Sequence, residues 1–189
     1  MSRSSLLEFF SRAGKLKGVE RTGWVEAGVL SPESVADHSY RTTLMAVIIA
    51  EAEGLDSLKA AKMTLIHDLA EAETGDLTPA QKSLEGDAHR RAEDAAMRSM
   101  LRLLPGKLAA SFTELWREYE RLDSPEARLV HDVDRLEMLL QASEYEDSGV
   151  EPSMLERFWR VGVGGGLTSD LAGEVRKKRK GSLSGPTSS

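Results

Sequence analysis

The sequence predicts an all-α protein that folds as a single helical bundle. Apolar residues recur at helical spacing through most of the 189 residues, and no stretch shows the sustained alternation of a β-strand. Proline and glycine fall between the amphipathic segments, where these residues commonly begin or end helices. The length is typical of one domain with a sizeable core.

Caps and breakers divide the chain into an ordered series of predicted helices, separated by loops. In the first half we expect helices over Ser4–Lys17, Val35–Glu53 and from Asp56 or Ser57 to Gly75, with a loop over residues 18–34. Ser34 is the predicted N-cap of the second helix, and Asp37 completes a capping box. The later helices are expected from Thr78-Pro79, over 83–104, over Lys107–Leu122, from Ser124-Pro125 to Glu146, over Met154–Val161 and over Ser169–Lys178.

Composition narrows the classes of function. Residues 1–167 are expected to form the folded domain, and residues 168–189 a short helix with a flexible basic and Ser/Gly-rich tail. Because the chain lacks cysteine, disulfides, thiolate metal sites and a cysteine nucleophile are excluded. We see no signal peptide and no membrane-spanning run, and we expect a cytoplasmic protein. The net charge of −6 argues against nucleic-acid binding by the whole surface.

Histidine and acidic residues in three predicted helices suggest a metal site. The dipeptide His67-Asp68 lies in an apolar helical segment, and Glu71 follows on the same face. His38 lies in the first turn of the preceding helix, and Asp134 lies among apolar residues in a later one, where an uncompensated carboxylate is costly. Two imidazoles with two carboxylates suit Mn, Co, Fe, Ni or Zn. Such a site can generate a hydroxide nucleophile near neutral pH.

The same residues also allow purely structural interpretations. His38 could be a partly exposed histidine at a helix start, and Asp134 could pair with Arg128 or Arg135 on the surface. Spacing alone does not decide between these interpretations and a metal site.

Two further histidines lie outside this set. His131-Asp132 has no acidic residue on the matching helical face, and we interpret it as solvated. His89 lies in a strongly charged helix and is predicted to be exposed.

Three stretches, RTGWVEAGVLSPESVADHSYR, LIHDLAEAETGDLTP and VDRLEMLLQASEYE, together resemble the HD-domain 5′-deoxynucleotidases, especially the branch of HD-domain-containing protein 2. The segment HRRAEDAAM is similar to that branch as well. The resemblance covers most of the chain, from about residue 3 to 160. It implies that one divalent metal is bound by His38, His67, Asp68 and Asp134, and that Glu71 is the catalytic acidic residue.

The resemblance also implies contacts with a second ion and with the substrate. A second, weaker ion, for which Mg is a candidate, is expected at Glu71, Asp76 and the Leu77 carbonyl. Asp76 and Trp24 are expected at the sugar, where Trp24 disfavours a 2′-hydroxyl.

The predicted phosphate contact is less direct. Arg21 is the basic residue nearest to the family's phosphate-binding arginine, because Gly23 stands where some members carry that arginine. Lys82, His89 and Arg90 are further candidates for neutralising the phosphate.

The implied function is that of an enzyme: a metal-dependent phosphomonoesterase that converts deoxyribonucleoside 5′-monophosphates to deoxyribonucleosides and phosphate. Two alternatives are an HD phosphohydrolase of another nucleotide (a dNTP, a cyclic or an alarmone phosphoester) and a non-catalytic nucleotide-binding module. The resemblance favours a homodimer, and the predicted dimer surface is formed by the helices that carry Phe112, Trp116, Phe158 and Trp159.

Overall fold

The computed structural model describes residues 2–183, with side chains described through residue 180. Within this range the predicted all-α fold class is confirmed, since the one β contact is an isolated bridge between Glu20 and Ser34. None of the described helices is long and apolar enough to cross a membrane. The elements are α1 Arg3–Ala13, the 3-10 helix η1 Gly14–Gly18, α2 Thr22–Glu26, α3 Val35–Glu53, α4 Ser57–His67, α5 Glu71–Thr74, α6 Pro79–Glu85, α7 Asp87–Leu101, α8 Gly106–Arg121, α9 Pro125–Asp147, α10 Pro152–Trp159 and α11 Gly166–Leu183.

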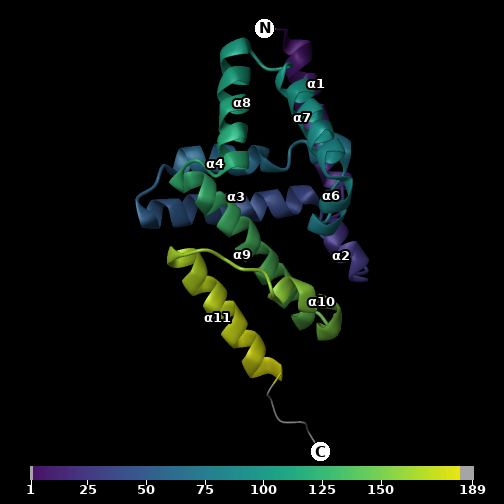
Figure 1. Cartoon of the computed structure of the whole chain (residues 1–189), viewed down its shortest axis with the longest axis vertical. Helices are drawn as coiled ribbons and strands as arrows, with labels where there is room; N and C mark the ends of the chain where they lie inside the picture. The colour runs from purple at the N-terminus through teal and green to yellow at the C-terminus, as the bar shows by residue number, and fades with distance from the viewer. Residues whose placement is uncertain (1, 184–189) are drawn as a thin grey trace, which may run out of the picture.

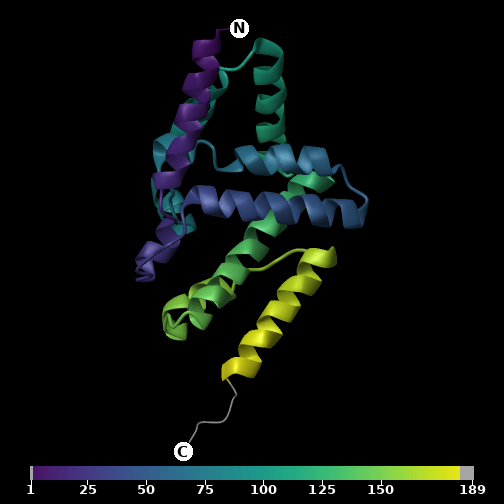
Figure 2. The same cartoon turned by 180° about the vertical axis from the view of Figure 1, so that it is seen from behind.

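Helices α3 and α4 lie side by side at the centre of the molecule, as both views show (Figure 1, Figure 2). Helix α8 packs against α4 and α9, while α9 crosses α3 and carries α10 and α11 on its far part. One apolar cluster joins α3, α4 and α9 with the C-terminal helices, and a second joins α1, α4, α5 and α7. The three helices predicted to carry metal ligands, α3, α4 and α9, therefore meet in one apolar cluster.

The start of α3 is fixed by the predicted capping box. The Asp37 amide donates to Ser34 Oγ at 3.1 Å, and the Ser34 amide donates to Asp37 Oδ2 at 3.0 Å. These two bonds satisfy amides that the first turn of a helix leaves without partners. The helix ends at Gly54, whose φ of 71° suits glycine. Both predicted ends of α3 are confirmed, and this register places His38 at the interface with α9.

The third predicted helix is interrupted before Gly75. Helix α4 ends at His67, and a new turn, α5, begins at Glu71. In a continuous helix the Asp68 amide would bond to the Thr64 carbonyl, but that carbonyl accepts a bond of 2.6 Å from His67 Nδ1. The Asp68 amide bonds to the Ile66 carbonyl instead. The histidine side chain thus helps to end its own helix.

Other boundaries differ from the prediction because of local contacts and glycine. The expected loop over 18–34 contains the short helix α2, and the helix expected over 83–104 is divided at Gly86, whose φ is 54°. The last helix, α11, is longer than predicted and includes the basic residues through Lys180. Arg179 in this helix pairs with Glu146 and Glu156, so the basic segment packs on the bundle. The part of the predicted flexible tail beyond residue 183 lies outside the described residues.

The four aromatic side chains named for the predicted dimer surface are largely covered within one molecule. Trp116, Phe158 and Trp159 are buried in the core of the chain, and Phe112 is half-buried. The homodimer and its surface on these helices stay predictions.

Because the capping box sets the start of α3, Ser34→Ala is expected to lower the free energy of unfolding by about 1 kcal/mol. Chemical denaturation measures this loss. Ser111→Ala, at an exposed position on α8, is the control and should change stability by less than about 0.5 kcal/mol. Equal stability of the two variants would contradict the assigned role of the cap.

Candidate metal centre

Four predicted ligands converge where α3, α4 and α9 meet. His38 Nε2 lies 3.0 Å from Asp134 Oδ1 and 3.8 Å from Asp68 Oδ2, and His67 Nε2 lies 3.1 Å from the same Asp68 oxygen. His38 is completely buried, so it is not a partly exposed histidine at a helix start. Asp134 is half-buried and pairs with His38 and Arg21. Its considered surface partners bond elsewhere, since Arg128 donates to the Leu122 carbonyl and Arg135 to the Gly162 carbonyl.

Hydrogen bonds fix which nitrogen of each imidazole faces the centre. His67 Nδ1 donates to the Thr64 carbonyl, which can only accept, so Nδ1 carries a proton. His38 Nδ1 lies 2.6 Å from Glu137 Oε2 and donates to that carboxylate. Both Nε2 atoms therefore point toward Asp68 and Asp134. Metal-binding histidines usually have their second nitrogen held in this manner.

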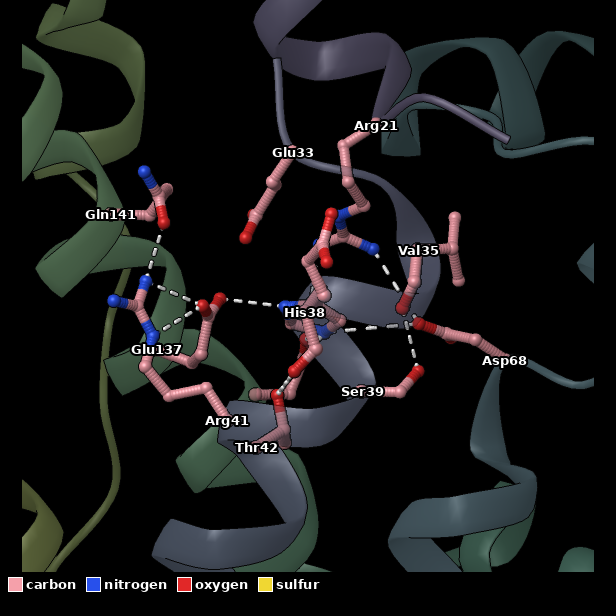
Figure 3. A network of polar contacts seen from close by, with 12 residues as sticks. Arg21, Glu33, Val35, His38, Ser39, Arg41, Thr42, Asp68, Glu137 and Gln141 are labelled. Carbon is pink, nitrogen blue, oxygen red and sulfur yellow. Dashed lines mark hydrogen bonds and ion pairs between the residues drawn. The ribbon is translucent and has the colours of Figure 1, made fainter. Parts of the chain in front are cut away.

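Glu137 is a functional residue that the sequence-based prediction did not include in the site. Its carboxylate is completely buried between His38 and Arg41, whose guanidinium donates to Glu137 Oε1 at 2.9 and 2.7 Å (Figure 3). Arg41 also bonds to Gln141 and Glu144. Glu137 and Glu144 on α9 both accept bonds from Arg41 on α3, and these bonds join the two helices. The added function of Glu137 is to orient His38.

The donor set fits a divalent metal. The ligand atoms of His38, His67 and Asp134 all lie within 4.8 Å of one another. Three buried atoms in this region have no hydrogen-bond partner, namely His67 Nε2, Asp68 Oδ2 and Glu71 Oε2. Buried polar atoms without partners are costly, and coordination would remove that cost for the nitrogen and the aspartate oxygen.

Electrostatics prepare the carboxylates for a cation. Burial opposes ionisation of Asp134, but the contact with His38 outweighs it and lowers the pKa of Asp134 to about 2. The pKa of Asp68 is also lowered, because His67, Arg21 and His38 outweigh burial. Burial and Arg21 disfavour the protonated form of His38, yet Asp134 and Glu137 raise its pKa to about 10. A metal at Nε2 would replace this proton.

Arg21 lies among the carboxylates of the centre. Its guanidinium is 3.5 Å from Asp68, 3.7 Å from Asp76 and 4.0 Å from Asp134. The backbone of the same segment is also fixed to Asp76, because the Thr22 amide donates to Asp76 Oδ2 at 2.5 Å and Thr22 Oγ1 donates to the Asp76 carbonyl at 2.7 Å. The structure thus brings Arg21 and Asp76 to the predicted site, and their contact with substrate stays a prediction.

Glu71 borders the metal centre at the start of α5. Its side chain is 3% exposed, and Oε1 lies 3.4 Å from Lys82 Nζ. Burial, followed by the negative charges of Asp68 and Asp76, raises the pKa of the Glu71 carboxyl well above its ordinary value. A carboxyl of this kind holds its proton more tightly than an exposed glutamate does. The second ion predicted at Glu71, Asp76 and the Leu77 carbonyl stays a prediction.

Trp24 lies in the core behind this region. It is 1% exposed, and its ring centroid is 3.9 Å from that of Phe158 and 5.2 Å from that of Tyr145. Its indole nitrogen donates to Glu33 Oε1 at 2.9 Å. The structure therefore places Trp24 in the packing that supports α2, and its predicted place beside the sugar stays a prediction.

A cavity of about 220 Å³ opens beside the metal centre. Its lining combines the catalytic candidates with side chains of α6, α7 and α8. The lining residues are His67, Asp68, Ala70, Glu71, Lys82, Glu93, Trp116, Tyr119 and Glu120.

Comparison with known proteins identifies the family. The HD domain family profile matches residues 13–162. This chain belongs to the HD-domain family. The human protein named 5′-deoxynucleotidase HDDC2 is 44% identical to it over 155 residues, which cover 82% of this chain and 75% of the human protein.

Solved structures are similar to this HD-domain chain throughout. A conserved hypothetical protein from Pyrococcus furiosus aligns with a TM-score of 0.72 at 38% identity, covering 92% of this chain and 99% of that one. A protein from Magnetospirillum magnetotacticum MS-1, described as a predicted metal-dependent phosphohydrolase, aligns with a TM-score of 0.70 at 28% identity, covering 95% and 92%. The predicted family membership and helical fold are confirmed.

The predicted exposure of His89 is wrong for this HD-domain chain. His89 is 5% exposed, because α7 turns it toward Glu93 inside the molecule. His131 and Asp132 are half-buried, and Asp132 Oδ1 accepts a bond of 2.9 Å from the Gly164 amide. The second HD dipeptide thus helps to attach the segment before α11.

Since Glu137 orients His38, Glu137→Gln is expected to weaken metal binding about ten- to hundredfold. Calorimetric titration of the metal-free full chain measures the affinity. Glu144→Gln is the matched control, because Glu144 also binds Arg41 but makes no contact with His38. A similar loss in both variants would show that Arg41, and not the imidazole contact, is responsible.

Proposed function

We propose that this chain is a metal-dependent phosphomonoesterase that converts deoxyribonucleoside 5′-monophosphates to deoxyribonucleosides and phosphate. The observation that carries the proposal is the convergence of His38, His67, Asp68 and Asp134. Two of these residues, His67 and Asp68, line one cavity together with buried Glu71. The name of the 44% identical human relative supports the deoxynucleotide substrate.

The four ligand side chains would hold one divalent ion. Imidazole nitrogens with carboxylate oxygens suit Mn, Co, Fe, Ni or Zn. When bound, such an ion supplies Lewis acidity to the phosphate and a water nucleophile near neutral pH. His67 and Asp68 line the cavity, so a phosphate bound there would lie beside these two ligand side chains.

Glu71 is the proposed proton carrier. Its Oε1 faces Lys82, whereas Oε2 has no partner and is free to exchange a proton with the attacking water or the leaving 5′-oxygen. Because the pKa of Glu71 is raised, the carboxyl holds a proton more readily than an exposed glutamate and can pass it to the leaving oxygen. In-line attack then requires that the phosphate lie between Glu71 and the ligand side chains.

Several finer assignments belong to the same proposal. Trp24 and Asp76 are assigned to contact the sugar of the substrate. A second ion is assigned to Glu71, Asp76 and the Leu77 carbonyl. The active form is proposed to be a homodimer. The absence of cysteine supports a cytoplasmic location.

The purified chain is expected to release phosphate from deoxyribonucleoside monophosphates when Mn, Co or Mg is added. Glu71→Gln should lower kcat by about 10²- to 10⁴-fold, since it removes general acid–base transfer. Metal retained after desalting, which removes the weakly held second ion, should stay at the wild-type level by elemental analysis, because Glu71 is not among the four ligands of the first ion. Phosphate release only from dNTPs or cyclic substrates would favour the alternative HD activity, and release from none would leave only a binding module.

Loss of Asp68 tests the metal assignment separately. Asp68→Asn is expected to abolish both metal retention and turnover, because it removes a buried anionic ligand. Full activity in Asp68→Asn would show that the ligand set is wrong.

A further inference from the structure

A chain of polar contacts connects Glu71 with the buried histidine of α7. Lys82 Nζ lies 3.4 Å from Glu71 Oε1 and 3.1 Å from Glu93 Oε1. The same Glu93 oxygen lies 2.9 Å from His89 Nε2, and His89 Nδ1 lies 3.6 Å from Glu85. The chain thus passes from the cavity wall through α6 and α7 to the surface.

The cations of the site differ in what surrounds them. Arg21 lies within 4.0 Å of three carboxylates, so its positive charge is already neutralised. Lys82, by contrast, lines the cavity, and its side chain keeps 37% of its exposure. Lys82 supplies the one ammonium or guanidinium group among the described residues of the lining. A phosphate in this cavity would therefore meet Lys82.

Lys82 is also kept charged and directed. Burial alone would lower the pKa of Lys82, but Glu71 and Glu93 outweigh burial and raise it. An ammonium has three donors, and the two carboxylates engage two of them. The third donor remains for a phosphate oxygen, the kind of acceptor that forms strong charge-assisted hydrogen bonds.

We propose that Lys82 binds the phosphate of the substrate, and that Glu93, itself oriented by His89, positions the Lys82 ammonium beside Glu71. The inference rests on the proposed function and assigns a phosphate-binding residue to that same site. Lys82 contacts the substrate, whereas Glu93 and His89 act through Lys82.

Burial of His89 supports the positioning role. The side chain is 5% exposed, and its Nε2 contact with Glu93 lacks the alignment of a full hydrogen bond. A histidine held in the interior at this cost needs a structural or functional use. Here it confines a carboxylate whose other neighbour is the Lys82 ammonium.

The test compares Lys82→Met, Lys82→Arg and Lys62→Met in the metal-loaded full chain. Lys82→Met keeps the apolar stem but loses the charge, and we expect KM and the inhibition constant of inorganic phosphate to rise about ten- to hundredfold. Lys82→Arg should recover part of this loss. Lys62→Met removes an exposed lysine of α4 outside the cavity and should match the wild type.

If Glu93 and His89 position Lys82, the effects of substituting them should depend on the presence of Lys82. Glu93→Gln and His89→Asn should each raise KM and the phosphate inhibition constant by several-fold. In the Lys82→Met background they should add no further change, because residues that act through one another are not additive. Additive effects would show that the pair does not act through Lys82.

Phosphate binding also separates this inference from the proposed function. Inorganic phosphate should raise the melting temperature of the metal-loaded wild type more than that of Lys82→Met. If the wild type hydrolyses deoxynucleotides while Lys82→Met binds phosphate equally well, the assignment of Lys82 is wrong and the proposed function stands. If the wild type hydrolyses none, the proposed function fails, and the melting temperatures still decide whether Lys82 binds phosphate.

Discussion

The structure depends on one buried contact, that of His38 between Glu137 and Asp134. These two carboxylates lie about one helical turn apart on α9, and the imidazole from α3 is placed between them. A charged group in the interior is strongly destabilising unless it has a partner. Here the Arg41 guanidinium pairs with the carboxylate of Glu137 on the side away from His38. The contact therefore fixes how α3 crosses α9, and it turns His38 Nε2 toward the α4 end. Packing alone would not specify that orientation.

The end of α4 sets the orientation of the second imidazole of the site, that of His67. His67 Nδ1 takes the Thr64 carbonyl, so one hydrogen bond both ends the helix and leaves His67 Nε2 free. The tight turn that follows brings Asp68 beside that nitrogen and starts α5 at Glu71, where the Glu71 amide bonds to the Asp68 carbonyl at 3.0 Å. A continuous helix would have placed these side chains about 100° apart for each residue along a straight cylinder. The turn gathers them at one wall of the cavity.

Sequence patterns predicted the features that depend on neighbouring residues. The capping box at Ser34 and the glycine at position 54 predicted the two ends of α3. The HD dipeptide with its flanking residues pointed to the ligands that converge in the structure. The patterns missed features that depend on distant residues. Helix α2 is attached to Asp76 through Thr22, which lies 54 residues away, and burial of His89 follows from the packing of α7. Helical periodicity carries no information about either contact.

The balance of charge at the site favours a bound cation. The carboxylates of Asp68, Asp76, Asp134 and Glu71 lie close together, and they pair with only one guanidinium and one ammonium group, those of Arg21 and Lys82. In a partly desolvated cavity, like charges a few ångströms apart repel strongly. Removing the proton from His38 would make the balance more negative still. A divalent cation at the imidazole nitrogens would offset this excess of negative charge, and under the proposed function it would also favour the approach of an anionic phosphate.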